Sequence, residues 1–546
     1  MEEIRNTKSQ VRFPLIVALA VSIGLVIGTL IVNPKAPVTP ESSKAVAKFR
    51  EVITNIDQSY VDTVNSGELV DMAIINMLEE LDPHTAYISA EELTLSNMHL
   101  RGGYDGIGIQ FDIIQDSIVV VKPNLNGPAA RAGMKMGDRI IAVEGENVAG
   151  VNLQNRDVTD RLLGQEGTSV KLAVWRPADK KIYDYTLVRG KIPQKTVIAA
   201  YMASEDIGYI KLVSFGINSY DEFRSALVDL KEKGMTKLIL DLQGNGGGYM
   251  AAAEKIADEL IGGKAVIVSQ KGKLERYSST VTASREGVFE TEPVIVLMDE
   301  YSASASEIVA GALQDNDRAL IVGRRSYGKG LVQMPINLVD GSELRLTIAR
   351  YYTPTGRSIQ KPYQIGGDLN YAHDIIDRFS NGEFYIQDSI KVNDSLKFMT
   401  PKGRIVYGGG GIMPDNFVPF DSALNTGYYN ALIDKRVIRE YTLDYILEHK
   451  ADLEDKTFEQ YMAGFQVLPE QLQEFIELAS LRGVDPDSAG LALSAAHIKA
   501  YIKAEIARGV WDEEEFFKIY NHTSNKAFER ALTLFDDAQA LVLDIQ

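Results

Sequence analysis

The chain has 546 residues, a formal net charge of −18, and 45% hydrophobic and 24% charged residues. A single hydrophobic core stops growing near ~250 to 300 residues, so several domains are expected, and the composition excludes a wholly disordered chain. The acidic balance argues against nucleic acid as a partner, because proteins that bind it gather Lys and Arg to neutralise phosphates. The absence of cysteine excludes disulfides, thiolate metal ligands and a cysteine nucleophile.

The first part of the chain predicts a membrane anchor. Residues 13–34 are uncharged, and the apolar run within them would span roughly 27 Å as a helix, close to the thickness of one bilayer core. Three basic residues precede this segment: Arg5, Lys8 and Arg12. By the positive-inside rule, residues 1–12 stay in the cytoplasm and the rest of the chain lies across the membrane, on the periplasmic side of a bacterial inner membrane. A cleaved signal peptide is the alternative, but no convincing small-x-small cleavage site follows the run.

The remaining sequence divides into four regions by its periodicity. Apolar residues at helical spacing predict a helical N-terminal region over 42–101. Short alternating runs over 102–190 predict a small β-barrel with two short helices, and the order of its elements resembles a PDZ domain. Strands and helices alternate over 191–425, which predicts an α/β domain with parallel strands. Residues 426–546 are mostly helical and carry no chemical motif.

A glycine-containing loop opens the second strand expected in the PDZ-like region: Gly106, Ile107, Gly108 and Ile109. Such loops capture a peptide carboxylate on backbone N–H groups while the peptide adds as a strand to the sheet edge. The alternative is a tight turn without a binding role.

Two helix starts in the α/β region carry candidate chemistry. A glycine-rich turn at 243–248 follows a strand, and its N–H groups at a helix N-terminus predict an anion site, for a phosphate or for the oxyanion of an acyl-transfer intermediate. A second strand leads into Ser302-Ala303-Ser304-Ala305-Ser306-Glu307, again at a helix start. Helix capping explains one of these serines, with Glu307 completing a capping box, but not all three.

The third candidate is Lys329, between two glycines. The segment 323–329 matches most of a phosphate-binding P-loop, but Gly330 stands where a Ser or Thr would bind magnesium, and a strand is expected at 331–336 where the P-loop requires a helix. Glycine neighbours let the lysine backbone approach another segment closely. If the ammonium is desolvated there, its pKa falls from ~10.4 toward ~7 to 8 and it serves as a general base. A solvated lysine is the alternative.

Other bases are absent from this stretch of the sequence. All six histidines lie outside residues 201–360, so no local Ser-His pair is expected, and neither H-E-x-x-H nor another His/carboxylate cluster with metal-ligand spacing occurs. Lysine is the base that remains, and serine activated by lysine is a recognised form of nucleophilic catalysis. The sequence predicts neither a metal nor a cofactor.

Six motifs in order resemble the carboxyl-terminal processing (tail-specific) peptidase family: residues 301–308, 311–315, 318–319, 328–333, 352–360 and 411–415. The resemblance covers about 42–420. It implies an α/β catalytic core with an inserted PDZ-like β-barrel, helical N-terminal and C-terminal regions, and one N-terminal transmembrane helix. A helical region containing Leu81-Asp82-Pro83-His84-Thr85 is also a family feature. Residues 361–410 form a polar insertion, and they and the helical tail depart from the family pattern.

The resemblance implies roles for individual residues. Ser304 is expected to be the nucleophile, Lys329 its general base and Gln333 the residue that orients the lysine. The oxyanion hole maps to the amides of Ala305 and Gly248. Protein substrates with accessible C-termini would dock on the PDZ-like domain and be cleaved through an acyl-enzyme. A membrane-anchored adaptor that binds protein tails without cleaving them is the alternative, and the oligomeric state is left open.

Overall fold

The computed structural model describes residues 40–98, 100–366 and 369–543. The expected anchor at 13–34 and the cytoplasmic segment 1–12 lie outside the described residues. Within the described ranges, no helix combines the length and the apolar character needed to span a membrane.

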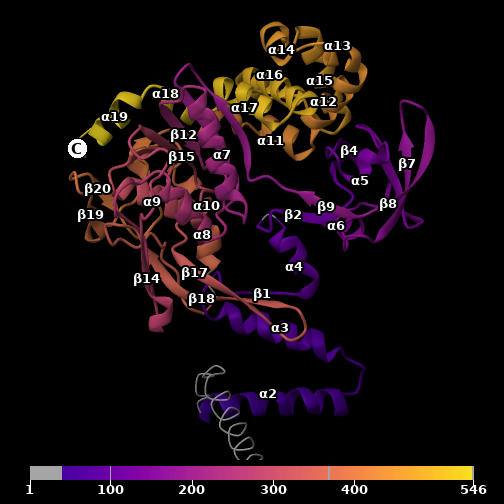
Figure 1. Ribbon diagram of the computed structural model, residues 1–546. Coiled ribbons are helices and arrows are strands. Elements are labelled where there is room, and N and C mark those ends of the chain that lie inside the picture. The colour runs from indigo at the N-terminus through magenta and orange to yellow at the C-terminus, as the bar shows by residue number, and fades with distance from the viewer. Residues whose placement is uncertain (1–39, 99, 367–368, 544–546) are drawn as a thin grey trace, which may run out of the picture. The chain divides into compact units, whose positions relative to one another are not determined.

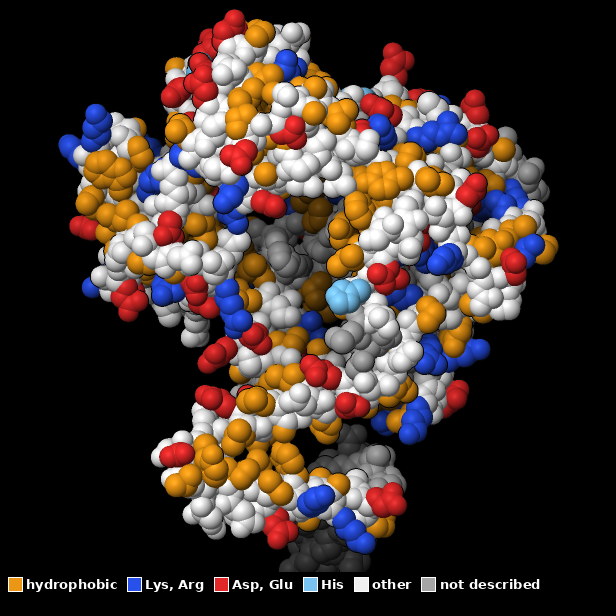
Figure 2. Space-filling model, turned by 180° about the vertical axis from the view of Figure 1, so that it is seen from behind, with side chains coloured by type: hydrophobic (Ala, Val, Ile, Leu, Met, Phe, Trp, Pro, Cys, Tyr) orange, Lys and Arg blue, Asp and Glu red, His pale blue; other side chains and the backbone are white. Residues whose placement is uncertain are grey.

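The chain separates into two compact units, with the boundary between Leu78 and Glu79. The first contains α2 (Pro40–Ser59) and most of α3 (Ser66–Glu79), where a bond from Ser66 Oγ to Asp57 Oδ1 spans 3.0 Å. Several apolar side chains of α2, among them Val46, Phe49 and Val52, are exposed, and hydrophobic side chains gather on this helix in the lower part of Figure 2. Residues 60–65 separate these two helices.

The PDZ domain is built on an antiparallel sheet of order β3-β4-β5-β7-β8, with β6 paired to β5. Its strands are β3 (Ile109–Ile113), β4 (Ile118–Pro123), β5 (Arg139–Val143), β6 (Glu146–Asn147), β7 (Ser169–Arg176) and β8 (Lys181–Val188), and its helices are α5 (Pro128–Arg131) and α6 (Asn155–Leu162). The sheet and α6 enclose an apolar core that includes Val120, Ile140 and Val158. The strands that enter and leave the domain, β2 (Gly103–Gly106) and β9 (Gly190–Pro193), pair with each other.

The α/β domain has a six-stranded sheet of order β10-β11-β12-β15-β16-β21, parallel except for the first pair. Its strands are β10 (Val197–Met202), β11 (Ile207–Leu212), β12 (Lys237–Asp241), β15 (Val294–Met298), β16 (Ala319–Gly323) and β21 (Asn416–Phe417). On one face, Leu238 and Leu240 pack into the core formed with α7 (Ser219–Glu232), α8 (Met250–Asp258) and α9 (Ala305–Asp315). Successive strand residues point to opposite faces, so Ile239 packs on the other side.

The end of the C-terminal region covers that second face of the sheet. Helices α18 (Lys526–Leu532) and α19 (Phe535–Leu543) lie over β15 and β16 (Figure 1). Phe528 and Phe535 belong to the same buried cluster as Ile239. The tail, which the sequence places outside the shared core, therefore completes the burial of a parallel sheet.

A second sheet, of order β1-β18-β13-β14 with β17 paired to β18, brings N-terminal residues to the α/β domain. Its strands are β1 (Ala86–Ile88), β13 (Val266–Gly272), β14 (Ser279–Thr282), β17 (Leu331–Asn337) and β18 (Glu343–Tyr352), with α4 (Ala90–Asn97) after β1. Strand β17 confirms the expectation that excluded a P-loop. The insertion contains α10 (Leu369–Ser380), β19 (Lys397–Met399) and β20 (Ile405–Tyr407).

The rest of the C-terminal region is a helical domain with its own core, which includes Tyr461, Phe475 and Ile502. Its helices are α11 (Gly427–Asp434), α12 (Val437–Glu448), α13 (Lys450–Glu454), α14 (Phe458–Gly464), α15 (Pro469–Leu481), α16 (Ser488–Val510) and α17 (Glu513–Thr523). Short 3₁₀ turns lie at Glu275–Tyr277, Gln387–Ser389, Asp394–Leu396 and Ser422–Leu424.

Candidate active site

Ser304 lies at the sharp turn between β15 and α9. Its backbone has φ 57° and ψ −112°, a conformation that costs free energy in a residue other than glycine and that clusters at functional sites. The flanking serines are fully buried and donate to other backbone segments, Ser302 Oγ to Leu242 O and Ser306 Oγ to Asn245 O, both at 2.8 Å. Of the three serines, therefore, Ser304 alone lines the cleft.

The glycine-rich turn lies directly against the nucleophile. A Cβ on Gly247 would be 2.7 Å from Ala303 O and 2.8 Å from Ser304 Cβ, and the residue has φ +101°. Buried Asn245 holds the turn, because its side chain accepts from Gly247 N at 2.9 Å and donates to Leu212 O at 2.9 Å. Only glycine allows this close approach in this conformation.

The predicted oxyanion donors belong to these same two segments. Ala305 is the first residue of α9, and Gly248 lines the cleft with Ser304. First-turn helix amides have no partner within the helix and carry the positive end of its dipole. The turn and the helix start thus bring backbone N–H groups toward a developing negative charge. The assignment of Ala305 and Gly248 stays a prediction.

Lys329 enters the same cleft from the loop before β17. The cleft has a volume of about 460 Å³, and Ser304, Lys329, Gln333 and Gly248 all line it. Lys329 Nζ donates to Gln333 Oε1 at 2.8 Å, and within the part of the chain that the structure describes the ammonium forms no ion pair. Burial, and secondly Arg345, lower the pKa of Lys329, although the carboxylates of Glu307 and Asp82 oppose this. A lysine in such a site reaches its neutral, proton-accepting form more readily.

Glu307 joins the nucleophile segment to the lysine segment. Its buried carboxylate accepts from the backbone N–H groups of Ser304, Gly328 and Lys329 at 2.7 to 2.9 Å, and from Ser326 Oγ at 2.5 Å. The sequence suggested a capping role for Glu307. The structure adds that this carboxylate also fixes the loop that contains the lysine.

His84 and Tyr371, to which sequence reasoning assigned no role in the site, complete a hydrogen-bonded ring behind Lys329. Gln333 Nε2 donates to His84 O, and the His84 ring Nε2 lies 2.7 Å from Tyr371 OH in the insertion. Tyr371 OH accepts from Gln360 Nε2 at 3.1 Å, and Gln360 Oε1 accepts from Gly330 N at 2.8 Å, beside Lys329 itself. The ring therefore connects the lysine to the N-terminal region and to the insertion.

His84 lies outside residues 201–360, where no Ser-His pair is expected, but the fold brings its backbone carbonyl to the Gln333 side chain. Burial, and secondly Lys329, lower the pKa of His84 to about 4, so the imidazole is neutral near pH 7. It forms no hydrogen bond with Ser304 among the described residues and so is not a base for it. In the sequence, the family motif at residues 81–85 pointed to His84, whereas no motif pointed to Tyr371.

The predicted carboxylate loop opens β3 as expected. Gly108 has φ +74°, and a Cβ there would be 2.7 Å from Ile192 Cδ1. Strand β3 is at the edge of its sheet, with β4 as its partner. The loop therefore opens an edge strand, which is where a peptide adds to a sheet. Its role in binding a carboxylate stays a prediction.

The fold and the cleft define a class of protein: a serine peptidase with an α/β core, a serine and a lysine that line one cleft, and a PDZ domain. Comparison with known families agrees, since residues 206–371 match Peptidase family S41 and residues 119–176 match the PDZ domain. Residues 428–512 match a family of unknown function, DUF8443.

Individual relatives place the chain more closely. It is 31% identical over 419 residues to the carboxy-terminal processing protease CtpB of Bacillus subtilis (strain 168), covering 75% of this chain and 83% of that protein. It is 37% identical over 321 residues to a carboxy-terminal-processing protease of Bartonella bacilliformis, covering 58% and 73%. A solved structure of the photosystem II D1 C-terminal processing protease is 29% identical, covers 59% of this chain and 90% of that chain, and has a TM-score of 0.33. This chain belongs to peptidase family S41, among the carboxy-terminal processing peptidases.

Proposed function

We propose that this protein binds the C-terminal segment of a polypeptide on its PDZ domain and cleaves the polypeptide at Ser304, with Lys329 as general base. The observation that carries the proposal is the shared cleft, in which Ser304 lies with a lysine whose ammonium donates a hydrogen bond to Gln333 and whose pKa is lowered by burial. Neither a metal nor a cofactor enters the mechanism.

In the acylation step, the neutral Lys329 amine accepts the Ser304 hydroxyl proton while Oγ attacks the scissile carbonyl carbon. The carbonyl oxygen becomes an oxyanion that the N–H groups of Ala305 and Gly248 stabilise. The C–N bond then breaks, and the Lys329 ammonium returns the proton to the leaving amine. Water attacks the acyl-enzyme with Lys329 again as base, which releases the new carboxylate and restores Ser304.

The test compares the full chain with its Ser304→Ala variant on an unstructured protein that ends in apolar residues. Cleavage by the wild type and none by the variant is expected. A second arm uses the same substrate with an amidated C-terminus, which removes the carboxylate that the PDZ loop would bind. Equal cleavage by the variant would overturn the nucleophile, and equal rates on both substrates would overturn recognition of the tail.

The membrane anchor is a separate part of the proposal. The uncharged segment 13–34 and its basic flank support an anchor with residues 1–12 in the cytoplasm and the catalytic region in the periplasm. Protease added to intact spheroplasts should then digest residues 42–546. Digestion only after lysis of the inner membrane would show that the orientation is wrong.

A further inference from the structure

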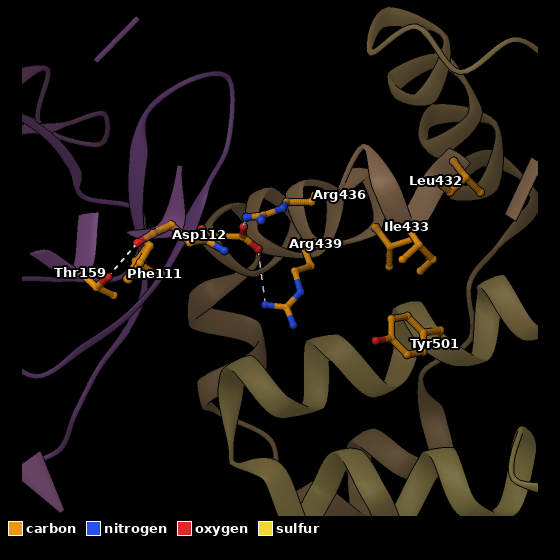
Figure 3. A pocket seen from close by; sticks show the side chains of 10 residues that line it. Phe111, Asp112, Thr159, Leu432, Ile433, Arg436, Arg439 and Tyr501 are labelled. Atoms are coloured by element: carbon orange, nitrogen blue, oxygen red, sulfur yellow. Dashed lines mark hydrogen bonds and ion pairs between the residues drawn. The ribbon is translucent and has the colours of Figure 1, made fainter. Parts of the chain in front are cut away.

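A pocket of about 550 Å³ lies where the PDZ domain meets the C-terminal helical domain (Figure 3). The PDZ domain contributes residues of β3 and α6 to it, and the helical domain contributes residues at α11, α12 and α16. The lining residues are Phe111, Asp112, Asn155, Thr159, Leu432, Ile433, Arg436, Ile438, Arg439 and Tyr501. Its volume falls within the range of pockets that bind small ligands or a few side chains.

The pocket lies along the path that a bound tail would take. A peptide whose carboxylate binds the loop at Gly106–Ile109 has its last residue at the start of β3, so it must run antiparallel to that strand. Each step upstream in the peptide then passes about one residue along β3, ~3.3 Å at a time. Phe111 and Asp112 therefore face peptide residues about two to four positions before the C-terminal one.

Contacts between the PDZ domain and the C-terminal helical domain hold the two sides of the pocket together. Buried Asp112 forms ion pairs with Arg436 and with Arg439, the second at 3.4 Å, and its carboxylate points toward both in Figure 3. Beside the pocket, Gln115 Nε2 donates to Glu440 Oε1 at 2.6 Å, and Leu443 packs on Ile114. The C-terminal helical domain thus forms one side of the pocket beside β3.

The charges of the pocket favour an anionic side chain. Two guanidinium groups oppose one carboxylate, and the other lining residues are uncharged. The Arg436 and Arg439 side chains are 36% and 48% exposed, whereas the Asp112 side chain is 4% exposed. Each guanidinium has five N–H donors, so one that pairs with Asp112 retains donors for a ligand.

We propose that this pocket is a specificity subsite that binds an acidic side chain two to four residues before the substrate's C-terminus, with Arg436 and Arg439 as its cationic groups. The proposal rests on the proposed function, since it needs a tail bound along β3. It gives residues 428–512 a role, because they supply the wall that recognises the acidic residue. Asp112 then limits affinity, since it already neutralises part of the positive charge.

The test measures binding of fluorescent peptides to the full-length Ser304→Ala chain, which retains the groove without cleaving the peptide. The peptides end in apolar residues with a free carboxylate and carry either Glu or Ala at one of the three upstream positions. One further peptide carries Glu but ends in an amide. At one position or more, the Glu peptide should bind about tenfold tighter than the Ala peptide, the scale of a charge-assisted hydrogen bond.

Three variants separate this proposal from a general effect on folding. Arg439→Gln should remove the preference for Glu and leave binding of the Ala peptide within about twofold. Asp112→Asn should strengthen the preference, because both arginines lose their intramolecular partner. Arg156→Gln is the matched control, since Arg156 is an exposed arginine of α6 that pairs with Glu92 and does not line the pocket.

The outcomes distinguish the two proposals. If free and amidated tails bind equally, the PDZ domain does not bind C-termini and the proposed function fails in that part. If free tails bind better but the Glu and Ala peptides bind alike, only the acidic subsite fails. Equal weakening of both peptides by Arg439→Gln would also overturn the subsite.

Discussion

The carboxylate of Glu307 accepts a hydrogen bond from the backbone N–H of Lys329 at 2.9 Å, and the same oxygen accepts one from the N–H of Ser304 at 2.8 Å. A single buried side chain thus fixes the backbone at both Ser304 and Lys329. Burial raises the pKa of this carboxyl group, and the hydrogen bonds from Ser326 and from backbone N–H groups oppose that rise. The relative placement of Ser304 and Lys329 therefore depends on a fully buried residue that does not line the cleft.

Glu307→Gln should destabilise the protein and slow catalysis. The amide keeps the shape of the carboxylate but turns one acceptor into a donor that faces N–H groups, which leaves buried donors unpaired. The expected loss is about 2 to 3 kcal/mol in the free energy of unfolding, with kcat/KM reduced at least tenfold. Denaturant unfolding and peptide cleavage measure these quantities. Glu300→Gln is the control, because Glu300 is a buried carboxylate that pairs with Arg324 away from the dyad. This variant should lose stability but retain kcat/KM. Equal loss of activity in both variants would contradict the role of Glu307.

The three serines should respond differently to alanine. Ser304→Ala should abolish cleavage with the fold intact, because it removes the attacking oxygen. Ser302→Ala and Ser306→Ala each lose a buried hydrogen bond and should cost about 1 to 3 kcal/mol of stability while retaining activity at low temperature. Peptide cleavage with parallel thermal unfolding tests this. A Ser302 or Ser306 variant that is stable but inactive would mean that the nucleophile is assigned wrongly.

Alanine substitutions at two neighbouring glycines of the glycine-rich turn should have different effects on activity. Gly247→Ala would place a methyl group against Ala303 O and Ser304 Cβ at a positive φ, so kcat should fall strongly. Gly246→Ala is the matched control, because a Cβ there meets nothing within 4 Å. Cleavage assays and circular dichroism on the two variants measure the contrast. Retained kcat in Gly247→Ala would show that the close approach of the turn to Ser304 is not required.

The sequence predicted the dyad because its chemistry is local. Ser304 and Lys329 belong to short motifs, and glycines flank the lysine where its backbone meets another segment, since a Cβ on Gly330 would be 2.9 Å from Gln360 N. The ring that supports the lysine was not predictable in this way. His84 and Gln333 are 249 residues apart, and neither periodicity nor spacing reports a contact of that separation. No histidine lies within residues 201–360, and the fold brings His84 from outside that stretch to the Gln333 side chain.

The sequence places some strands of the PDZ domain well and leaves another out. The apolar run at 139–143 coincides with β5, and the run at 170–176 is one residue shorter than β7. No predicted strand covers β8, of which only the Leu187 side chain is buried. The amphipathic stretch 429–449 predicts a helix, but the structure breaks it between α11 and α12, where Arg436 adopts a left-handed conformation with φ 55° that its residue type does not announce.

Lys329 makes a prediction about pH. Because burial lowers its pKa, kcat/KM should rise with pH along one ionisation that reports this lysine in the free enzyme. Lys329→Met and Lys329→Arg should each lose about 10² to 10⁴ in kcat, because neither side chain can accept the proton. Substantial activity in Lys329→Arg would refute the general-base role.

The same lowered pKa has a cost in stability. Between the lowered folded pKa and the ordinary lysine value, the unfolded chain binds a proton that the native site resists. The free energy of unfolding should therefore rise with pH through that window, and below the folded pKa the full cost remains. Lys329→Met removes this cost and should be more stable than the wild type near neutral pH, as thermal unfolding at several pH values would show. A variant that is less stable there would contradict the burial of a charged lysine.

The ring through His84 and Tyr371 predicts a shift in the activity profile. Tyr371→Phe removes the hydroxyl that contacts His84 and Gln360, so Gln333 holds the lysine less firmly and water reaches the ammonium more easily. The pKa of Lys329 should then rise, moving the pH profile of kcat/KM to higher pH. Tyr363→Phe is the matched control, because Tyr363 is a neighbouring tyrosine that bonds Arg350 instead. A lower kcat without a shifted profile would mean that Tyr371 only supports the fold.

His84 itself should contribute to the loss of folding stability at acidic pH. Its folded pKa of about 4 reflects burial and the nearby charges of Lys329 and Lys361, with Asp82 opposing them. Between the unfolded value near ~6.5 and this folded value, the unfolded chain takes up a proton that the native protein does not, so stability is present above that window and declines as pH falls through it. His84→Asn removes this titration, and its free energy of unfolding should depend less steeply on pH between 6.5 and 4. Denaturant unfolding of both proteins at matched pH measures the two slopes. Parallel slopes would show that His84 takes up its proton in the native state as readily as in the unfolded chain, and the imidazole beside Lys329 would then carry a charge at mildly acidic pH.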